Sequence, residues 1–237
     1  MKWKLLGVVA TPPILMALLI GCKADVPAAA MPVAVTSSST PAADLVPILA
    51  LGDSLFAGYG LAPGQSYPAH LEAALQARGI PARIVNAGVS GDTTADGLAR
   101  VDFVLKSMPK KPALAIISLG GNDVLRAVPP TETRKNLGAL LAKLQTAKVP
   151  VVVLGMLAPP NLGAEYADQF NALYPALAKQ YGAKLVPFFL QPLLAHPELV
   201  QGDHIHPTLP GIDLLVSYTV DDVAGALANP AAAPRLR

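Results

Sequence analysis

Four short polar stretches of this sequence contain the residue types that serine-dependent hydrolysis requires. They are Gly52-Asp53-Ser54, Gly88-Val89-Ser90-Gly91-Asp92-Thr93, Gly120-Gly121-Asn122-Asp123 and Asp203-His204-Ile205-His206-Pro207. A serine hydroxyl is a weak nucleophile until a neighbouring base takes its proton, and histidine is the side chain that most often does so. Backbone N–H and amide groups then stabilise the charge that develops on the substrate oxygen. The four stretches together supply a serine, a glycine, an asparagine and an aspartate–histidine pair.

None of the first three stretches is specific by itself. Ser54 follows Asp53 directly after an apolar run, where a serine more often caps a helix or bends the chain than acts as a nucleophile. Asn122 is an ordinary loop residue when considered alone, and Gly91 is an ordinary turn glycine. Only the occurrence of all the stretches in one chain favours chemistry over structure.

The fourth stretch leaves two alternatives open. His204 and His206 both flank Ile205, so either histidine is a candidate base by residue type. Asp203 together with the two histidines is also a candidate metal site, but no second cluster in the sequence offers further ligands. The sequence therefore favours a site without metal or cofactor.

The segments around these stretches predict an α/β fold. Five apolar runs rich in β-branched residues are expected to be buried strands, at 46–52, 82–89, 113–120, 149–157 and 184–189. Segments with helical spacing lie between or after them, at 67–78, 95–107, 132–147, 164–181 and 209–227. This alternation predicts a three-layer α/β/α sandwich with a five-stranded parallel sheet and right-handed crossovers. Ligands bind at the carboxyl ends of strands in such folds, and the four polar stretches fall there or in the loop beyond.

With this arrangement the sequence resembles the GDSL family, also called SGNH hydrolases, whose four blocks centre on serine, glycine, asparagine and histidine. The letters GDSL occur verbatim at 52–55. The closer resemblance is to the bacterial multifunctional thioesterase, protease and lysophospholipase group and to related arylesterases. It rests on LGDSL-AGY, SGDT followed by GLAR, LGGND-LR, YP-LAK and the late D-x-I-H-P, and it covers 45–227. The family has the flavodoxin-like SGNH hydrolase fold.

The resemblance implies a role for each block. Ser54 would be the nucleophile, and His206 would be its base because the family places the base directly before proline, with an aspartate three residues earlier. That aspartate, Asp203, would hold the imidazole in the right tautomer. The oxyanion donors would be the backbone N–H groups of Ser54 and Gly91 and the side-chain amide of Asn122. No G-x-S-x-G occurs, so a different turn must present the serine.

The resemblance also indicates where an acyl group would lie. The segment 156–163 falls where the relatives carry a loop beside that group, so we expect Leu157, Pro159 and Leu55 to line an apolar pocket. Ordinary loop packing is the alternative for these three residues. His204 occupies a position that is often glycine in the relatives, so its side chain either lines the site or faces solvent.

The first residues of the chain are typical of an export signal. Lys2 and Lys4 precede an apolar run that is short for a membrane span, and Leu-Ile-Gly-Cys closes it at Cys22. This ending resembles the bacterial lipobox, and Cys22 is the only cysteine in the chain, so we expect it to be lipidated. We predict a signal peptide at 1–21 and a Pro/Ala/Ser-rich tether at 22–44.

The rest of the chain is expected to be one hydrolase domain at 45–229, followed by a loose tail at 230–237. The formal net charge of +2 and the absence of a basic cluster disfavour nucleic-acid binding. We expect a monomer whose lipid anchor holds it on a membrane. Because Lys23 replaces the aspartate that retains lipoproteins at the inner membrane, the periplasmic side of the outer membrane is favoured.

These expectations combine into a lipid-anchored serine esterase acting on aryl esters, acyl thioesters or lysophospholipids through an acyl-enzyme on Ser54. Export argues against acyl-CoA as the natural substrate and favours a lipid or other small acyl ester. Two alternatives stay open from the sequence: a carbohydrate O-acetylesterase of the same superfamily, and a non-catalytic surface-binding lipoprotein. A binding protein has no need of all five site residues, which weighs against the second alternative.

Overall fold

A parallel β-sheet forms the centre of the computed structural model, in which residues 45–229 are described. The strands are β1 (Val46–Gly52), β2 (Ala82–Gly88), β3 (Leu114–Ser118), β4 (Val151–Leu154) and β5 (Lys184–Val186). Their order is β2-β1-β3-β4-β5, and every neighbouring pair is parallel. The chain moves from β1 outward to β2 and then returns to the other side of β1, so the winding direction switches at the carboxyl end of β1. This switch point is where such folds bind ligands.

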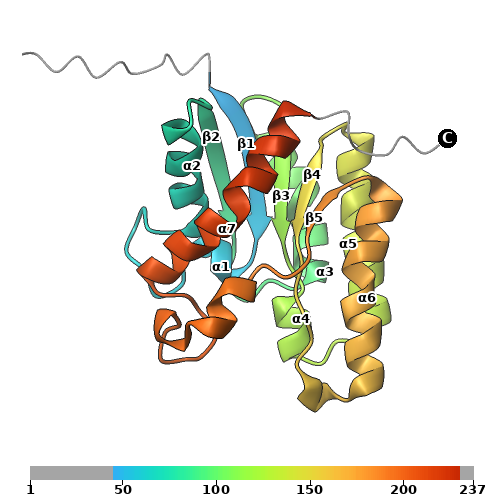
Figure 1. The fold of residues 1–237 in the computed structure, drawn as a ribbon. Coiled ribbons are helices and arrows are strands. Elements are labelled where there is room, and N and C mark those ends of the chain that lie inside the picture. Colours follow the sequence, from blue (N-terminus) through green and yellow to red (C-terminus); the bar gives the residue numbers. More distant parts are fainter. Residues whose placement is uncertain (1–44, 230–237) are drawn as a thin grey trace, which may run out of the picture. The chain divides into compact units, whose positions relative to one another are not determined.

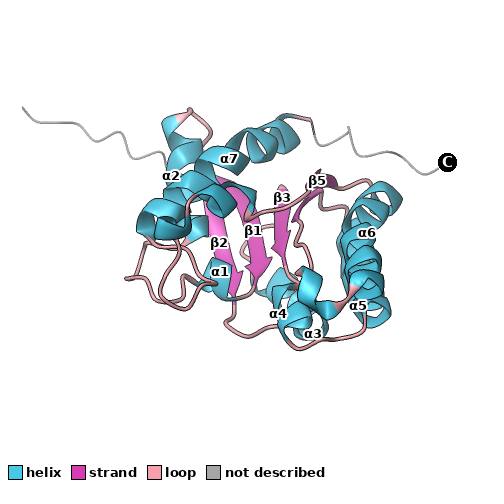
Figure 2. Ribbon diagram, turned by 60° about the horizontal axis from the view of Figure 1, so that its bottom comes forward, coloured by secondary structure: helices cyan, strands magenta, loops and turns pink. Residues whose placement is uncertain are grey.

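Helices cover both faces of the sheet, as Figures 1 and 2 show. On one face α2 (Tyr67–Ala77) packs against α7 (Leu209–Ala228). On the other face α5 (Pro130–Thr146) packs against both α3 (Thr94–Ser107) and α6 (Ala164–Tyr181). The predicted three-layer α/β/α sandwich with a five-stranded parallel sheet is therefore confirmed.

The burial of the strands and helices follows their sequence patterns. All five residues of β3 are buried, as expected for a strand with helices on both of its faces. In α5 the buried leucines are spaced i, i+3, i+4 and i+7, which places them on one stripe against the core. They are Leu137, Leu140, Leu141 and Leu144. Within 45–229, none of the helices combines the length and the apolar character needed to span a membrane.

The ends of the strands differ from the sequence-based prediction. β5 stops at Val186 instead of reaching residue 189, because Pro187 has no N–H to donate to a neighbouring strand. The runs 113–120 and 149–157 also extend past β3 and β4, and their last residues form loops at the carboxyl edge of the sheet. These loop residues resemble strand residues in the sequence because they too are mostly apolar.

Two short helices at this edge were not predicted. α1 (Ser54–Ala57) begins just after β1, and α4 (Gly121–Leu125) begins shortly after β3. Four or five residues are too few to show a helical period, so pattern reading could not detect them. The 3₁₀ helices were missed for the same reason; they are η2 (Pro160–Leu162), η3 (Gln191–Ala195) and η4 (Pro197–Leu199). The predicted signal peptide 1–21, the tether 22–44 with Cys22 and the tail 230–237 lie outside the described residues.

Candidate active site

Ser54 is held at the carboxyl edge of the sheet by the junction between β1 and α1. It is the first residue of α1, and Asp53 caps that helix by accepting the N–H of Leu55 on its Oδ1 at 3.1 Å. Asp53 is only 2% exposed, and Leu55 and Phe56 are buried in the core, so the turn is anchored on its inner side. The side chain of Ser54 itself stays half-buried and reaches the cavity described below.

The structure brings Ser54, His206 and Asp203 into one hydrogen-bonded series. The Nε2 atom of His206 lies 2.8 Å from Oγ of Ser54, although 152 residues separate them in the chain. The Nδ1 atom of His206 lies 2.6 Å from Oδ2 of Asp203. Both ring nitrogens of the histidine therefore have a partner, and the side chain of His206 is 13% exposed.

The loop that carries Asp203 and His206 is folded around the aspartate. Oδ1 of Asp203 accepts the backbone N–H groups of Ile205 at 2.9 Å and of His206 at 3.0 Å. The backbone N–H of His206, its side chain and the N–H of Ile205 hold the pKa of Asp203 well below its ordinary value. The carboxylate that faces the imidazole is therefore charged and fixed in direction.

His204 lies in the same loop but is not part of the hydrogen-bonded series. Its φ of +60° is in the left-handed region, which glycine adopts at less cost than histidine and which explains why glycine would fit this position. His204 lines the cavity and has no contact with Ser54 or Asp203 in the described hydrogen bonds. No group of three potential metal ligands occurs within 45–229, and both nitrogens of His206 are already engaged. The geometry therefore fits His206 and Asp203 as partners of a serine rather than as metal ligands.

Gly91 and Asn122 lie on neighbouring loops that are joined to each other. Gly91 has φ +88°, a backbone conformation that side chains other than glycine's rarely adopt. Asn122, the second residue of α4, donates from Nδ2 to the carbonyl of Asp92 at 3.0 Å. Arg126 donates to the carbonyl of Gly91 at 2.8 Å and so ties the end of α4 to the same loop. Asn122 lines the cavity with Ser54, whereas Gly91 is not one of its lining residues.

Hydrogen bonds of Arg100 and Asp123 hold these two loops in place. Arg100 donates from Nε to Oδ2 of Asp92 at 2.6 Å and from a guanidinium NH2 to the carbonyl of Gly52 at 3.0 Å, so it links the loop after β2 to the end of β1. Asp123 accepts three hydrogen bonds from Thr94 and Thr133. Asp92 and Asp123 therefore hold the loops after β2 and β3 in place.

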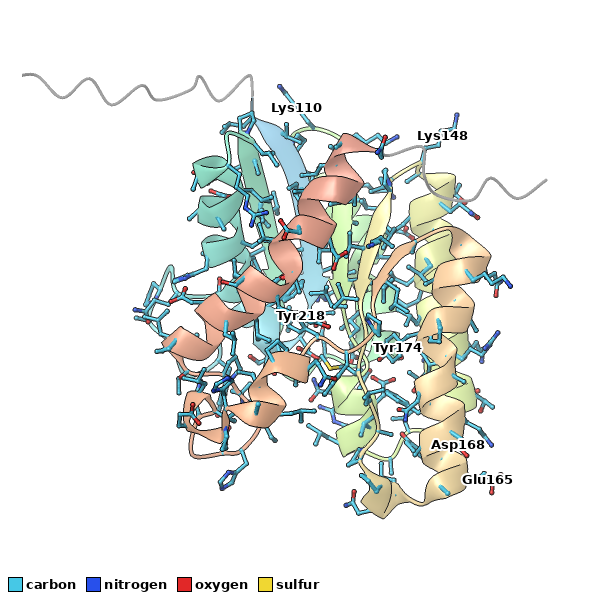
Figure 3. All side chains as sticks on the ribbon, in the orientation of Figure 1. Lys110, Lys148, Glu165, Asp168, Tyr174 and Tyr218 are labelled. Atoms are coloured by element: carbon cyan, nitrogen blue, oxygen red, sulfur yellow. The ribbon has the colours of Figure 1, made fainter. Side chains whose placement is uncertain are left out.

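Tyr174 supports the loop after β3 from the side of α6. Its ring points from α6 toward the sheet (Figure 3), and its hydroxyl donates to the carbonyl of Leu119 at 2.9 Å. Burial raises the pKa of Tyr174 well above its ordinary value, so the hydroxyl keeps the proton that it donates. The loop that leads into Asn122 is therefore held in place by a neutral, buried hydrogen bond.

A largely apolar cavity of about 340 Å³ opens beside Ser54. The three predicted lining residues, Leu55, Leu157 and Pro159, all contribute to it. Other apolar residues of its wall were not predicted from the sequence; they are Val124, Leu125, Met156, Phe188, Leu190 and Ile205. All of them except Ile205 lie near the end of a predicted apolar run or shortly after it, and this position was the signal that could have identified them. The cavity can take an apolar group next to the serine hydroxyl.

The buried carboxyl of Asp53 predicts a pH-dependent stability. Burial raises the pKa of Asp53 to about 6, against the opposing effects of its bond to Leu55 and of His206. The folded state holds this proton more tightly than the unfolded chain. The contribution of Asp53 to the free energy of unfolding is therefore fully present below about pH 4 and falls by about 3 kcal/mol as pH rises through about 6. Asp53→Asn keeps the cap to Leu55 but has no charge to bury, so it should lose this component.

Urea denaturation of both proteins between about pH 4 and pH 7 measures this difference. We expect the unfolding free energy of Asp53→Asn, relative to wild type, to rise by about 3 kcal/mol across that range. Asp168→Asn, which changes an exposed carboxyl on α6 (Figure 3), is the matched control and should follow the wild-type profile. Parallel profiles for Asp53→Asn and wild type would show that Asp53 is not a buried acid with a raised pKa.

Known proteins similar to this chain are ester hydrolases. The esterase TesA of Pseudomonas aeruginosa is 41% identical over 162 residues, which are 68% of this chain and 80% of that protein. The thioesterase 1/protease 1/lysophospholipase L1 of Escherichia coli is 38% identical over 160 residues, which are 68% of this chain and 74% of that protein. The crystal structure of AlinE4, an SGNH-hydrolase family esterase, superposes with a TM-score of 0.67 at 59% identity, covering 78% of this chain and 97% of AlinE4.

With its fold and these relatives, the chain is an ester-bond hydrolase. Residues 50–214 also match the GDSL-like lipase/acylhydrolase family along most of the domain. The chain belongs to that family, which confirms the resemblance noted in its sequence.

Proposed function

We propose that this chain is a serine esterase in which Ser54 forms an acyl-enzyme with the substrate. The observation that carries the proposal is the series of short contacts from Oγ of Ser54 through His206 to Asp203, at 2.8 and 2.6 Å. Both distances are within hydrogen-bond reach, and the series ends on a charged carboxylate. These are the three parts that an activated serine needs.

In the first step His206 accepts the Ser54 proton on Nε2 while Oγ attacks the acyl carbonyl carbon. For Nε2 to accept, the proton of the neutral imidazole must sit on Nδ1, where it donates to Asp203. The carboxylate then stabilises the imidazolium that forms. His206 next gives the proton to the leaving alcohol or thiol as the acyl–oxygen or acyl–sulfur bond breaks, which leaves the acyl group on Ser54. In the second step His206 takes a proton from a water that attacks the acyl carbon. It returns this proton to Oγ of Ser54 as the acyl–Oγ bond breaks, which releases the carboxylic acid and restores the serine.

The negative oxygen formed in both steps needs donors beside Ser54. The backbone N–H groups of Ser54 and Gly91 and the amide of Asn122 would supply them. An asparagine amide has two hydrogens, and Asn122 uses one to hold the carbonyl of Asp92, so the other is free to face the oxyanion. Arg126 donates to the carbonyl of Gly91, in the peptide group that follows the Gly91 N–H, and so restrains the loop that carries this donor before substrate arrives.

The cavity supports a substrate with an apolar acyl group, and a lysophospholipid or short-to-medium acyl ester fits this chemistry. TesA is named an esterase, and the Escherichia coli relative is named a thioesterase and lysophospholipase. A series of p-nitrophenyl esters from acetyl to dodecanoyl tests the assignment. Each methylene that the cavity buries should raise kcat/KM by up to about fourfold until the cavity is full. A strict preference for acetyl would contradict it and favour the carbohydrate O-acetylesterase.

The location of the enzyme is a separate part of the proposal. We infer that residues 1–21 direct export, that Cys22 carries a lipid, and that the tether 22–44 links it to the hydrolase domain at 45–229. The supporting observation is the single cysteine of the chain, placed directly after Leu-Ile-Gly. Labelled palmitate should enter the wild-type protein but not Cys22→Ser when both are made in a Gram-negative cell. Equal labelling of the two would contradict the anchor.

A further inference from the structure

The ring of Tyr59 lies against the imidazole of His206, outside the hydrogen-bonded series. The two ring centroids are 4.4 Å apart, and the ring planes are inclined by 33°. Tyr59 is 53% exposed, and it is not one of the described residues that line the cavity. Its ring therefore belongs neither to the core nor to the wall of the cavity, and it contacts the ring of His206.

The backbone of Tyr59 is tied to both sides of the site. Its N–H donates to the carbonyl of Ser54 at 3.1 Å, so the ring is carried on the segment that directly follows the serine. Its carbonyl accepts Nε2 of Gln201 at 2.9 Å. The same Nε2 donates to the carbonyl of Pro207 at 2.8 Å, and the N–H of Gln201 donates to the carbonyl of His206 at 2.7 Å. One glutamine thus joins the segment after Ser54 to the segment that carries His206.

The next residue, Gly60, makes this junction possible. It has φ +74°, and a Cβ atom built on it would lie 2.2 Å from Oε1 of Gln201. A side chain at this position would therefore displace the glutamine and with it the carbonyl of Tyr59. The position of the Tyr59 ring beside His206 therefore depends on a glycine at position 60.

The hydrogen bonds of His206 are made by its two ring nitrogens and do not involve the faces of the ring. Its bonds to Ser54 and Asp203 run in the plane of the imidazole, so they fix the direction of the two nitrogens but do not cover the faces of the ring. Tyr59 covers one face. An aromatic ring also attracts a cation held within about 6 Å of its centroid, and the imidazolium is a cation that exists only after Ser54 has given up its proton. Such an attraction acts on the transition state more than on the ground state and raises kcat.

We propose that Tyr59 is a positioning residue for His206, held in place by Gln201, and that its ring face stabilises the imidazolium formed during acyl transfer. This inference rests on the proposed function, because it needs His206 to act as the base for Ser54. The phenol hydroxyl has no part in it, so a phenylalanine should replace Tyr59 fully.

Four variants of the purified enzyme test the proposal: Tyr59→Phe, Tyr59→Leu, Tyr59→Ala and, as a matched control on α7, Tyr218→Ala. Tyr218 is another partly exposed tyrosine, 39% exposed, that does not line the cavity. We expect Tyr59→Leu and Tyr59→Ala to lower kcat by roughly 2- to 30-fold with little change in KM. The rate of covalent labelling by a fluorophosphonate should fall in parallel, because it reports the reactivity of Ser54 without an acyl chain. Tyr59→Phe and Tyr218→Ala should behave as wild type.

The proposal is overturned if Tyr59→Ala keeps the wild-type kcat, if Tyr59→Phe falls as far as Tyr59→Ala, or if only KM changes. The second outcome would assign the effect to the hydroxyl, and the third would assign Tyr59 to substrate binding. Ser54→Ala is measured beside these variants. If Ser54→Ala keeps the wild-type activity, the proposed function itself is overturned. If Ser54→Ala is inactive while Tyr59→Ala keeps the wild-type kcat, only this inference is overturned.

Discussion

Replacing Ser54 with alanine is expected to lower kcat for a p-nitrophenyl ester by roughly 10⁴- to 10⁶-fold. Without Oγ no acyl-enzyme can form, and the proton that His206 takes in the wild type is absent. KM should change little, because the apolar cavity beside Ser54 keeps its lining residues. The small residual rate would come from the oxyanion donors acting on an attacking water.

Ser217→Ala is the matched control for this variant. Ser217 lies on α7, is exposed and donates only to the carbonyl of Asp213 in its own helix, so its loss should leave kcat unchanged. Thermal unfolding of both variants shows whether either has lost its fold. A folded Ser54→Ala enzyme with more than a small fraction of the wild-type kcat would exclude the acyl-enzyme on Ser54.

Asp203→Asn is expected to lower kcat by about 10⁴-fold, by an effect on the tautomer of His206. Oδ1 of Asp203 accepts two backbone N–H groups, from Ile205 and His206, so an asparagine must keep its oxygen there. Its NH2 group then takes the place of Oδ2 and donates to Nδ1 of the imidazole. The ring proton moves to Nε2, which can no longer accept the proton of Ser54.

The prediction concerns Oδ2 alone, because the asparagine keeps an oxygen at the position of Oδ1 and replaces only Oδ2 with NH2. Asp168→Asn, which replaces an exposed carboxyl on α6, should keep the wild-type kcat and serves as the control. NMR of the imidazole nitrogens should show the proton on Nδ1 in the wild type and on Nε2 in Asp203→Asn. If Asp203→Asn retained activity within about tenfold of wild type, a directing role for this carboxylate would be wrong.

Much of the fold and the candidate site could be predicted because both follow the strand ends. Continuous apolar runs identified the five strands, and in a parallel sheet the carboxyl ends of those strands meet at one edge. Ser54 and Asn122 follow β1 and β3 closely, so their approach follows from topology alone. Asp203 and His206 are three residues apart on one loop, a spacing short enough for a direct hydrogen bond.

Other features depend on contacts that no local pattern contains. The wall of the cavity includes Leu125 and Phe188, which come from different loops and meet only after the sheet has formed. The left-handed conformation of His204 is likewise not indicated by its residue type, because residues other than glycine seldom adopt it. The junction made by Gln201 joins backbone carbonyls, which every residue type possesses, so the residue identities there gave no signal.

The central claim is that Ser54 is the residue that becomes acylated, and covalent labelling tests it most directly. The purified enzyme is incubated with a fluorophosphonate, digested with a protease and mapped by mass spectrometry while esterase activity is followed in the same sample. We predict a single label per molecule, located on Ser54, with activity lost in proportion to labelling. Loss of activity with the label on another residue, or full activity with Ser54 labelled, would contradict the claim.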